Sequence, residues 1–188
     1  MRIIGGNFKG KKILEPKDKE TRPLKDLTKE SIFNIIIHSN KFSIELEKSY
    51  VLDLFSGTGS FGLECLSRKA KHVCFVENYI GILPILKNNL SNLKTVKNYS
   101  IIEKNILIDI DFFGKIGKFD IIFLDPPYKD KNINKIFDNI EKSEVLNNGG
   151  IIILHRHKNE KEIFSKKFKK IEEKTYGLSK IMFFNYLN

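Results

Sequence analysis

Two short stretches of the sequence carry residues whose types and spacing could do chemistry. In the first, Asp53 lies in the apolar run 51–55, and the glycine motif Gly57-x-Gly59-x-x-Gly62 follows it. In the second, Asp125-Pro126-Pro127-Tyr128 directly follows the apolar run 119–124. Each run has the pattern of a buried parallel strand. We therefore expect both stretches at the carboxyl edge of an open α/β sheet, where such sheets bind ligands.

The glycine motif alone does not choose its ligand. Glu77 follows it by about 20 residues, the spacing of a dinucleotide-binding fingerprint, so a nicotinamide dinucleotide is one candidate. Asp53 favours another, because a carboxylate before the glycines repels a pyrophosphate and attracts a cationic amino-acid tail. S-adenosylmethionine has an ammonium, a sulfonium and a ribose but no phosphate. With this cofactor, Glu77 would accept hydrogen bonds from the ribose hydroxyls.

The Asp125-Pro126-Pro127-Tyr128 stretch suits an exocyclic amine on a flat base. Its prolines stiffen the loop and cannot extend a strand. The Asp125 carboxylate and the Pro126 carbonyl would accept the two N–H bonds, while Tyr128 stacks on the ring. Holding both N–H groups out of the ring plane frees the nitrogen lone pair for in-line attack on a sulfonium methyl. A surface turn is the alternative, and the position after a strand favours catalysis.

Polar residues at four predicted strand ends indicate one shared site. They are Asp53, Glu77, the segment 103–105 and Asp125. A single acidic residue at a strand end is often a helix cap, whereas four in successive β-α units favour a functional site.

Alternating strands and helices would position these residues. We expect an α/β fold with an open sheet, parallel in its main part and covered by helices on both faces. The predicted strands are 51–55, 73–76, 100–102, 119–124, 151–154, 169–175 and 181–186. The predicted helices are 25–37, 61–68, 80–93, 106–113 and 133–143, and residues 1–14 are predicted to form a β-hairpin.

Length and composition limit the class of protein. A chain of 188 residues with 41% hydrophobic content can fold around one main core. Cys65 and Cys74 lie in apolar segments and are expected to be buried, reduced thiols. We see no secretory signal and no apolar run of about 20 residues, so we expect a cytoplasmic protein without a membrane span. The net charge of +10 favours a polyanionic partner, although a lysine-rich proteome would give the same excess.

Three motifs in order resemble a known enzyme class. The pattern D-x-F-x-G-x-G from Asp53, then Glu77, then Asp125-Pro126-Pro127-Tyr128 resemble the class I S-adenosylmethionine-dependent methyltransferases that modify exocyclic amines. The resemblance is closer to the bacterial 16S ribosomal RNA guanine-N2 methyltransferases of the RsmD type. It is carried by RIIGG at 2–6, TRP at 21–23, ESIFN at 30–34 and LDLFSGTGSFGLECLSR at 52–68.

The resemblance extends nearly end to end and implies both a fold and an activity. The fold is a Rossmann-like methyltransferase sheet, mostly parallel with an antiparallel last strand. Residues 41–188 would form this domain, and residues 1–40 a hairpin and helix extension that faces RNA. The activity is methyl transfer from S-adenosylmethionine to a guanine amine of 16S rRNA, in the small ribosomal subunit or its assembly intermediate. We expect no metal and a monomer.

The resemblance also implies roles for individual residues. The catalytic residues would be Asp125, Pro126 and Tyr128. The methionine part of the cofactor would lie against the turn made by Asp53, Phe55, Ser56, Gly57, Thr58 and Gly59. The ribose would bind Glu77, and the adenine would meet Asn105 and Ile106. An RNA-facing basic rim would contain Arg2, Lys9, Lys11, Lys12 and Arg22, although an ordinary solvated hairpin would carry similar charges.

The sequence departs from the family pattern at two places. The family has a second acidic residue near Asn78, so fewer ribose contacts are expected. A glutamate is also expected at the end of the fifth strand, where the sequence reads His155-Arg156-His157. A metal-binding pair of these histidines would lack a visible third ligand, and the sequence assigns this segment no role.

Two other functions fit the same motifs. DNA adenine-N6 or cytosine-N4 methyltransferases use the same proline loop, but 188 residues leave little room for a domain that reads a DNA sequence. A non-enzymatic RNA-binding assembly factor would have no need of Asp53, Glu77 and the proline loop. The sequence therefore favours an RNA methyltransferase.

Overall fold

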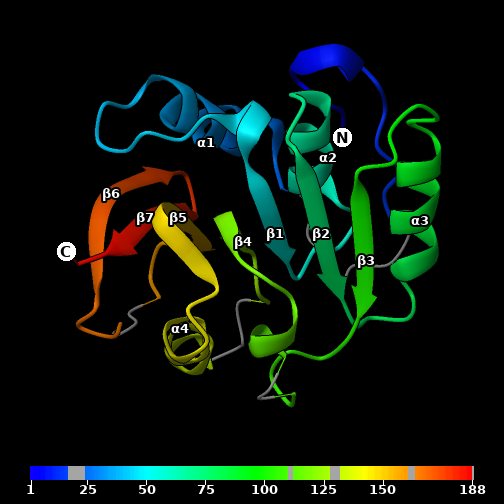
Figure 1. The fold of residues 1–188 in the computed structure, drawn as a ribbon. Helices are drawn as coiled ribbons and strands as arrows, with labels where there is room; N and C mark the ends of the chain where they lie inside the picture. The colour runs from blue at the N-terminus through cyan, green and yellow to red at the C-terminus, as the bar shows by residue number, and fades with distance from the viewer. Residues whose placement is uncertain (17–23, 110–111, 128–131, 161–163, 188) are drawn as a thin grey trace.

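The computed structural model describes residues 1–16, 24–109, 112–127, 132–160 and 164–187. In these residues seven strands form one sheet in the order β3-β2-β1-β4-β5-β7-β6 (Figure 1). The strands are β1 Tyr50–Leu54, β2 His72–Glu77, β3 Tyr99–Glu103, β4 Phe119–Leu124, β5 Leu146–His157, β6 Phe168–Tyr176 and β7 Ser179–Tyr186. Strands β1 to β5 pair in parallel, and β7 pairs antiparallel with both β5 and β6. The predicted Rossmann-like sheet is confirmed.

The strand order places the candidate site. The chain passes from β1 to β2 and β3 on one side, then returns to place β4 and β5 on the other side of β1. The order therefore reverses between β1 and β4, and the carboxyl ends at such a reversal form the usual ligand crevice of an α/β sheet. Asp53 and Asp125 come from these two strands.

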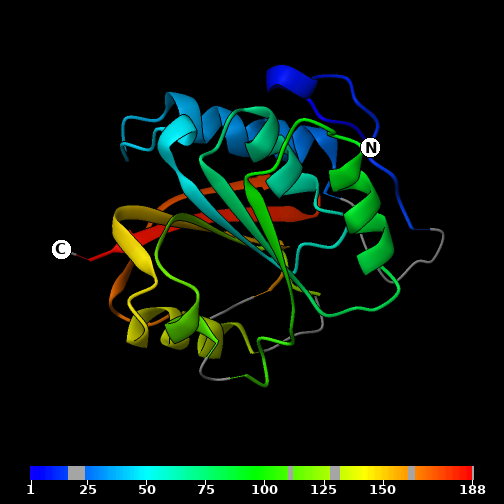
Figure 2. The same cartoon turned by 45° about the vertical axis from the view of Figure 1, so that its right-hand side comes forward.

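Helices cover both faces of the sheet, as expected from the sequence (Figure 2). The helices α1 Asp26–His38, α2 Ser60–Ser67 and α3 Leu83–Ser91 pack on one face, and α4 Ile133–Lys142 packs on the other. Successive side chains of a strand point to opposite faces. In β4, Ile121 and Phe123 accordingly join the first core, while Ile122 and Leu124 join the second.

The structure corrects one predicted element and shortens another. The helix predicted over 106–113 is absent from the described part of that segment. There, Asn105 Oδ1 accepts the Leu107 N–H at 3.0 Å, an Asx turn that competes with helix formation, and only the 3-10 turn η3 Phe113–Lys115 follows. Helix α3 begins at Leu83 rather than residue 80, with Pro84 in its first turn as predicted.

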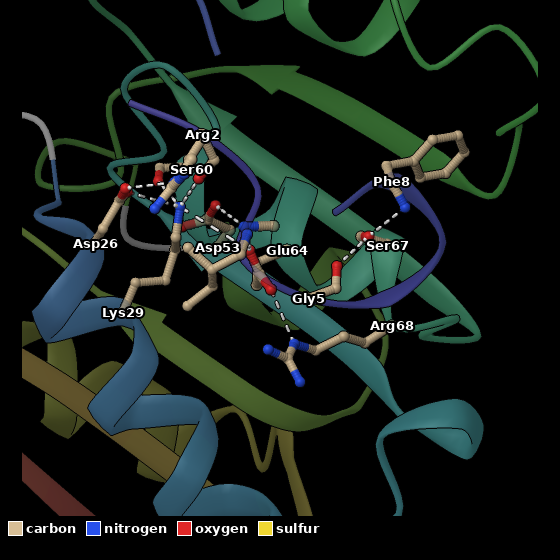
Figure 3. A network of polar contacts seen from close by, with 12 residues as sticks. Arg2, Gly5, Phe8, Asp26, Lys29, Asp53, Ser60, Glu64, Ser67 and Arg68 are labelled. Atoms are coloured by element: carbon tan, nitrogen blue, oxygen red, sulfur yellow. Dashed lines mark hydrogen bonds and ion pairs between the residues drawn. The ribbon is translucent and has the colours of Figure 1, made fainter. Parts of the chain in front are cut away.

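The amino-terminal segment forms a short antiparallel pairing in place of two full strands. Arg2 bridges Lys12, and the 3-10 turn η1 Gly6–Phe8 connects the two sides. Helix α2 holds this segment through two side chains (Figure 3). Glu64 Oε2 accepts the Ile4 N–H at 2.8 Å. Ser67 Oγ donates to the Gly5 carbonyl at 2.6 Å and accepts the Phe8 N–H at 2.9 Å. The division into residues 1–40 and 41–188 stays a prediction.

None of the helices among the described residues has the length and apolar character needed to cross a membrane.

Candidate active site

The turn after β1 has the backbone that its glycines predict. Gly57 and Gly59 have φ values of 55° and 82°, in the left-handed region that glycine adopts without strain. Phe55 also lies there, with φ of 59°, at a cost of about 1–2 kcal/mol for a residue with a side chain. Ser56 Oγ lies 2.6 Å from the Asp53 carbonyl, and the Gly59 N–H donates to the Ser56 carbonyl at 2.7 Å. The chain therefore accepts local strain to form a tight cradle.

The third glycine of the motif serves packing. A Cβ at Gly62 would lie 2.2 Å from Phe75 Cε1, so α2 can approach β2 only because this position has no side chain. A Cβ at Gly59 would meet Leu86 Cδ1 at 2.6 Å. The Gly62 contact matches the general role of the third glycine in such turns, which is close helix–strand packing.

Asp53 is buried beneath this turn. Its Oδ2 accepts the Gly62 N–H at 3.0 Å, and only 1% of the residue is exposed. Burial raises the pKa of Asp53 well above its usual value, and the hydrogen bond from Gly62 opposes that rise. The charges of Asp125 and Glu77 raise the pKa of Asp53 further. The parallel register of β1 with β2 and β4, and of β2 with β3, places the four predicted strand ends at one edge of the sheet.

Glu77 holds the turn as well as facing the site. Its Oε2 accepts the Gly57 N–H at 2.7 Å, and its Oε1 accepts the N–H groups of Asn78 and Tyr79 at 2.8 and 2.9 Å. An ionised carboxylate has about four acceptor positions, so at least one remains for another donor. Asn78 is exposed beside it.

The segment after β3 carries the two residues expected near the adenine. Ile106 is buried in the core on the α4 face, and Asn105 caps its own turn through the Leu107 N–H. Two residues after Ile106, Ile108 is 76% exposed. Burial puts the Ile106 side chain in the core, so the exposed part of this turn is the part that could contact a ligand.

The loop after β4 presents Asp125 at the same edge of the sheet. Pro126 is buried and Pro127 is exposed, so the loop leaves the sheet within two residues. Tyr128, the predicted stacking residue, lies outside the described residues. The Asp125 side chain is 21% exposed, in contrast to Asp53.

Two residues that the sequence did not assign hold this loop. His155 Nδ1 lies 2.8 Å from Asp125 Oδ1. Arg156 Nη1 donates to the Pro127 carbonyl at 3.1 Å. Burial lowers the pKa of His155, but the charge of Asp125 and the hydrogen bond between His155 and Asp125 outweigh burial and raise that pKa overall. The sequence offered one indication of this role, because both residues lie near the carboxyl end of β5, the strand next to β4.

A buried ion network links the amino terminus to the glycine turn (Figure 3). Lys29 of α1 is fully buried, and its Nζ donates to the Arg2 carbonyl at 2.5 Å and to Ser60 Oγ at 3.3 Å. The same Nζ lies 3.9 Å from Glu64 Oε2 and 3.8 Å from Asp26 Oδ1. Burial lowers the pKa of Lys29, although Glu64 and Asp26 counteract that effect.

The described residues of the predicted basic rim lie on the amino-terminal hairpin, which packs on α2, and their role in RNA binding stays a prediction. Arg2 and Lys12 are exposed near the start of α2, with Arg2 Nε 3.4 Å from Asp26 Oδ2. Lys9 adjoins η1, which contacts the other end of that helix, about 10 Å away along its axis. Lys11 Nζ donates to the Asn92 carbonyl and lies 5.6 Å above the Phe8 ring.

Arg22 lies outside the described residues. Cys65 and Cys74 are buried free thiols, and burial raises the pKa of each, which makes them poor nucleophiles. Among the residues that the structure describes, no group of three or more His, Cys, Asp or Glu could hold a metal ion.

Comparisons with known proteins agree with this geometry. The family described as "Conserved hypothetical protein 95" matches residues 1–185. The ribosomal RNA small subunit methyltransferase D of Haemophilus influenzae is 30% identical over 179 residues, covering 95% of this chain and 90% of that protein. The enzyme of the same name from Buchnera aphidicola subsp. Baizongia pistaciae is 30% identical over 189 residues, covering 100% of this chain and 92% of that protein.

A solved structure shows the same fold over nearly the whole chain. It is that of the yhhF protein of Escherichia coli, which is assigned as a methyltransferase. It superposes with a TM-score of 0.81 at 25% identity and covers 99% of this chain and 97% of that one. The chain belongs to the Conserved hypothetical protein 95 family, the RsmD-type class I methyltransferases.

Proposed function

We propose that this protein methylates the exocyclic N2 amine of a guanine in 16S rRNA of the small ribosomal subunit. S-adenosylmethionine is the methyl donor, and ribosomal RNA is the substrate class. The observation that carries the proposal is the pair of carboxylates at the β1/β4 reversal. Asp53 lies beneath the glycine turn, and Asp125 is partly exposed on the proline loop. This pair suits one cationic ligand and one amine.

The residues of the glycine turn would hold the donor. The buried charge of Asp53 would stabilise the ammonium of the methionine part, above the cradle formed by residues 55–59. Glu77 has an acceptor position for a ribose hydroxyl. The turn at Asn105 and Ile106 would border the adenine.

Asp125 and Pro126 would act on the amine. The Asp125 carboxylate and the Pro126 carbonyl accept its two N–H bonds, and Tyr128 stacks on the base. S-adenosylmethionine would supply an activated methyl group, which the nitrogen lone pair would attack while the electron pair of the carbon–sulfur bond leaves on sulfur. The methylated nitrogen loses one proton to Asp125, whose partial exposure lets that proton pass to water.

The deciding experiment offers three substrates in parallel. Small subunits that lack the modification, naked rRNA and DNA are incubated with methyl-labelled cofactor, and labelled RNA is digested to nucleosides. We expect label in the RNA as N2-methylguanosine. Label only in DNA would contradict the proposal, and label in no substrate would favour a binding factor without catalysis.

A further inference from the structure

Two consecutive residues of β5, His155 and Arg156, form hydrogen bonds with the loop that carries Asp125. Leu124 of β4 pairs with Leu154 of β5, which places the following residues, Asp125 and His155, side by side. His155 Nδ1 lies 2.8 Å from Asp125 Oδ1. An ionised carboxylate can only accept hydrogen bonds, so the histidine ring donates this one. One oxygen of Asp125 is therefore engaged by the protein itself.

Arg156 reaches the same loop from the other face of the sheet. Side chains alternate along a strand, so Arg156 points to the α4 face while His155 points to the face of α1 to α3. The guanidinium donates to the Pro127 carbonyl at 3.1 Å and also lies 3.9 Å from Glu160 Oε2. Arg156 is 1% exposed. Burying a charge is costly unless it is hydrogen-bonded. The buried guanidinium therefore favours the loop position in which the Pro127 carbonyl accepts its hydrogen bond.

We propose that His155 and Arg156 are positioning residues for the methyl transfer. His155 fixes Oδ1 of Asp125 and so presents the second oxygen to the base amine. Arg156 fixes the Pro127 carbonyl. Because Pro126 directly precedes Pro127, this contact also limits the position of the Pro126 carbonyl. This inference rests on the proposed function, because it assigns the two residues to the amine-holding step.

The first test separates the hydrogen bond from the bulk of the side chain. In His155→Asn the amide nitrogen stands as many bonds from Cα as Nδ1 does, so the donor to Asp125 can be kept. His155→Leu has the same shape as the asparagine and no donor. We expect the leucine variant to lose about 10- to 100-fold in kcat, as a small misplacement of a reacting group does, and the asparagine variant to recover most of that loss.

The second readout separates positioning from general stability. Cofactor Kd, measured by calorimetry, and thermal midpoint are recorded for both variants, with His157→Asn as a control in the same strand. We expect kcat to fall in the leucine variant while cofactor Kd and the KM for cofactor stay unchanged. Equal kcat for the asparagine and leucine variants, or the same loss in the control, would overturn the role of the Asp125 contact.

Arg156 is tested by a matched pair of its own. Arg156→Lys keeps the charge and loses the planar fork that reaches the Pro127 carbonyl, and Arg156→Met keeps only the chain length. We expect both variants to lose kcat, with methionine the more severe. Full kcat in Arg156→Met would remove Arg156 from the proposal.

A third measurement needs no substrate and none of the His155 or Arg156 variants. The His155 ring is titrated by NMR in the wild-type chain and in Asp125→Asn. Among the residues that the structure describes, the charged groups that act on this ring are Asp125, which raises its pKa, and Arg156, which lowers it. On the neighbouring strand β7, the residue paired with His155 is the apolar Ile181. We expect the pKa of His155 to fall in the variant, and an unchanged pKa would contradict the contact.

The outcomes distinguish this inference from the proposed function. No label in RNA with the wild-type chain defeats the proposed function, whatever the titration shows. Normal labelling by wild type together with full kcat in His155→Leu defeats the positioning role alone.

Discussion

The glycine turn and the proline loop each present a carboxylate at the same edge of the sheet, but the protein holds them differently. Asp53 is buried, and the N–H that binds it lies nine residues further along the same strand–turn–helix unit. Asp125 is partly exposed, and the histidine that binds it lies 30 residues away on β5. The Asp53 carboxylate is thus held within its own strand–turn–helix unit, whereas the Asp125 carboxylate is held by a residue of a neighbouring strand.

The different contacts of the glycine turn and the proline loop suit their different proposed roles. The glycine turn keeps its shape through its own backbone hydrogen bonds, through the N–H groups that it donates to Val76 and Glu77 of β2, and through the packing of α2 on β2. The proline loop borders residues 128–131, which the structure does not describe, and its described side-chain contacts come from His155 and Arg156. Substitutions in the two halves should therefore separate cofactor binding from methyl transfer.

Asp125→Asn should have the largest effect on activity. The amide keeps the shape of the side chain but loses the charge that accepts the amine N–H and the product proton. We expect kcat to fall by about 10²- to 10³-fold while cofactor Kd stays unchanged, measured by label transfer and calorimetry. Full activity in this variant would contradict a catalytic role for Asp125.

Asp53→Asn should act on the cofactor instead. Losing the charge near the ammonium should weaken cofactor binding by about 10- to 100-fold. The pKa of Asp53 is raised in the fold, so the unfolded chain ionises first as pH rises. Stability of the wild type without cofactor is therefore greatest below the unfolded pKa and falls as pH rises towards the folded pKa.

The matched measurement is the thermal midpoint of both chains across pH without cofactor. We expect the asparagine variant to gain stability relative to wild type as pH rises above about 4. For wild type, cofactor affinity should rise with pH, because the ammonium favours ionised Asp53. A pH-independent difference in midpoint would show that Asp53 is not held with a raised pKa.

Gly62→Ala tests the packing of the donor half. Alanine normally stabilises a helix relative to glycine, but here its Cβ would lie 2.2 Å from Phe75 Cε1. We expect a loss of about 1–3 kcal/mol in unfolding free energy, read from denaturant unfolding. Gly114→Ala is the control, since a Cβ there meets nothing within 4 Å. Equal stability of the two variants would contradict the packing role.

Lys12→Ala should have the smallest effect and leave both halves intact. Lys12 is exposed near the start of α2, and we propose that it contacts RNA phosphate. We expect weaker RNA binding and a salt slope lower by about 1, with cofactor Kd unchanged. Lys169→Ala, exposed on β6, is the control. An unchanged slope for Lys12→Ala would remove this residue from the RNA-facing rim.

The sequence by itself determined the features whose causes are local. The glycine turn, the acids at strand ends and the strand predicted over 119–124 could be read from consecutive residues, because backbone freedom and alternation act over a few positions. The helix predicted over 106–113 failed for a local reason too, since Asn105 forms an Asx turn there.

Only the tertiary structure decided which distant residues meet. His155 and Arg156 read as an unexplained departure in the sequence, and their role depends on the β4–β5 register. The contacts of Glu64 and Ser67 with the amino-terminal segment likewise join residues about 60 positions apart in the chain. Register and helix packing join residues far apart in the chain, and no local pattern encodes that distance.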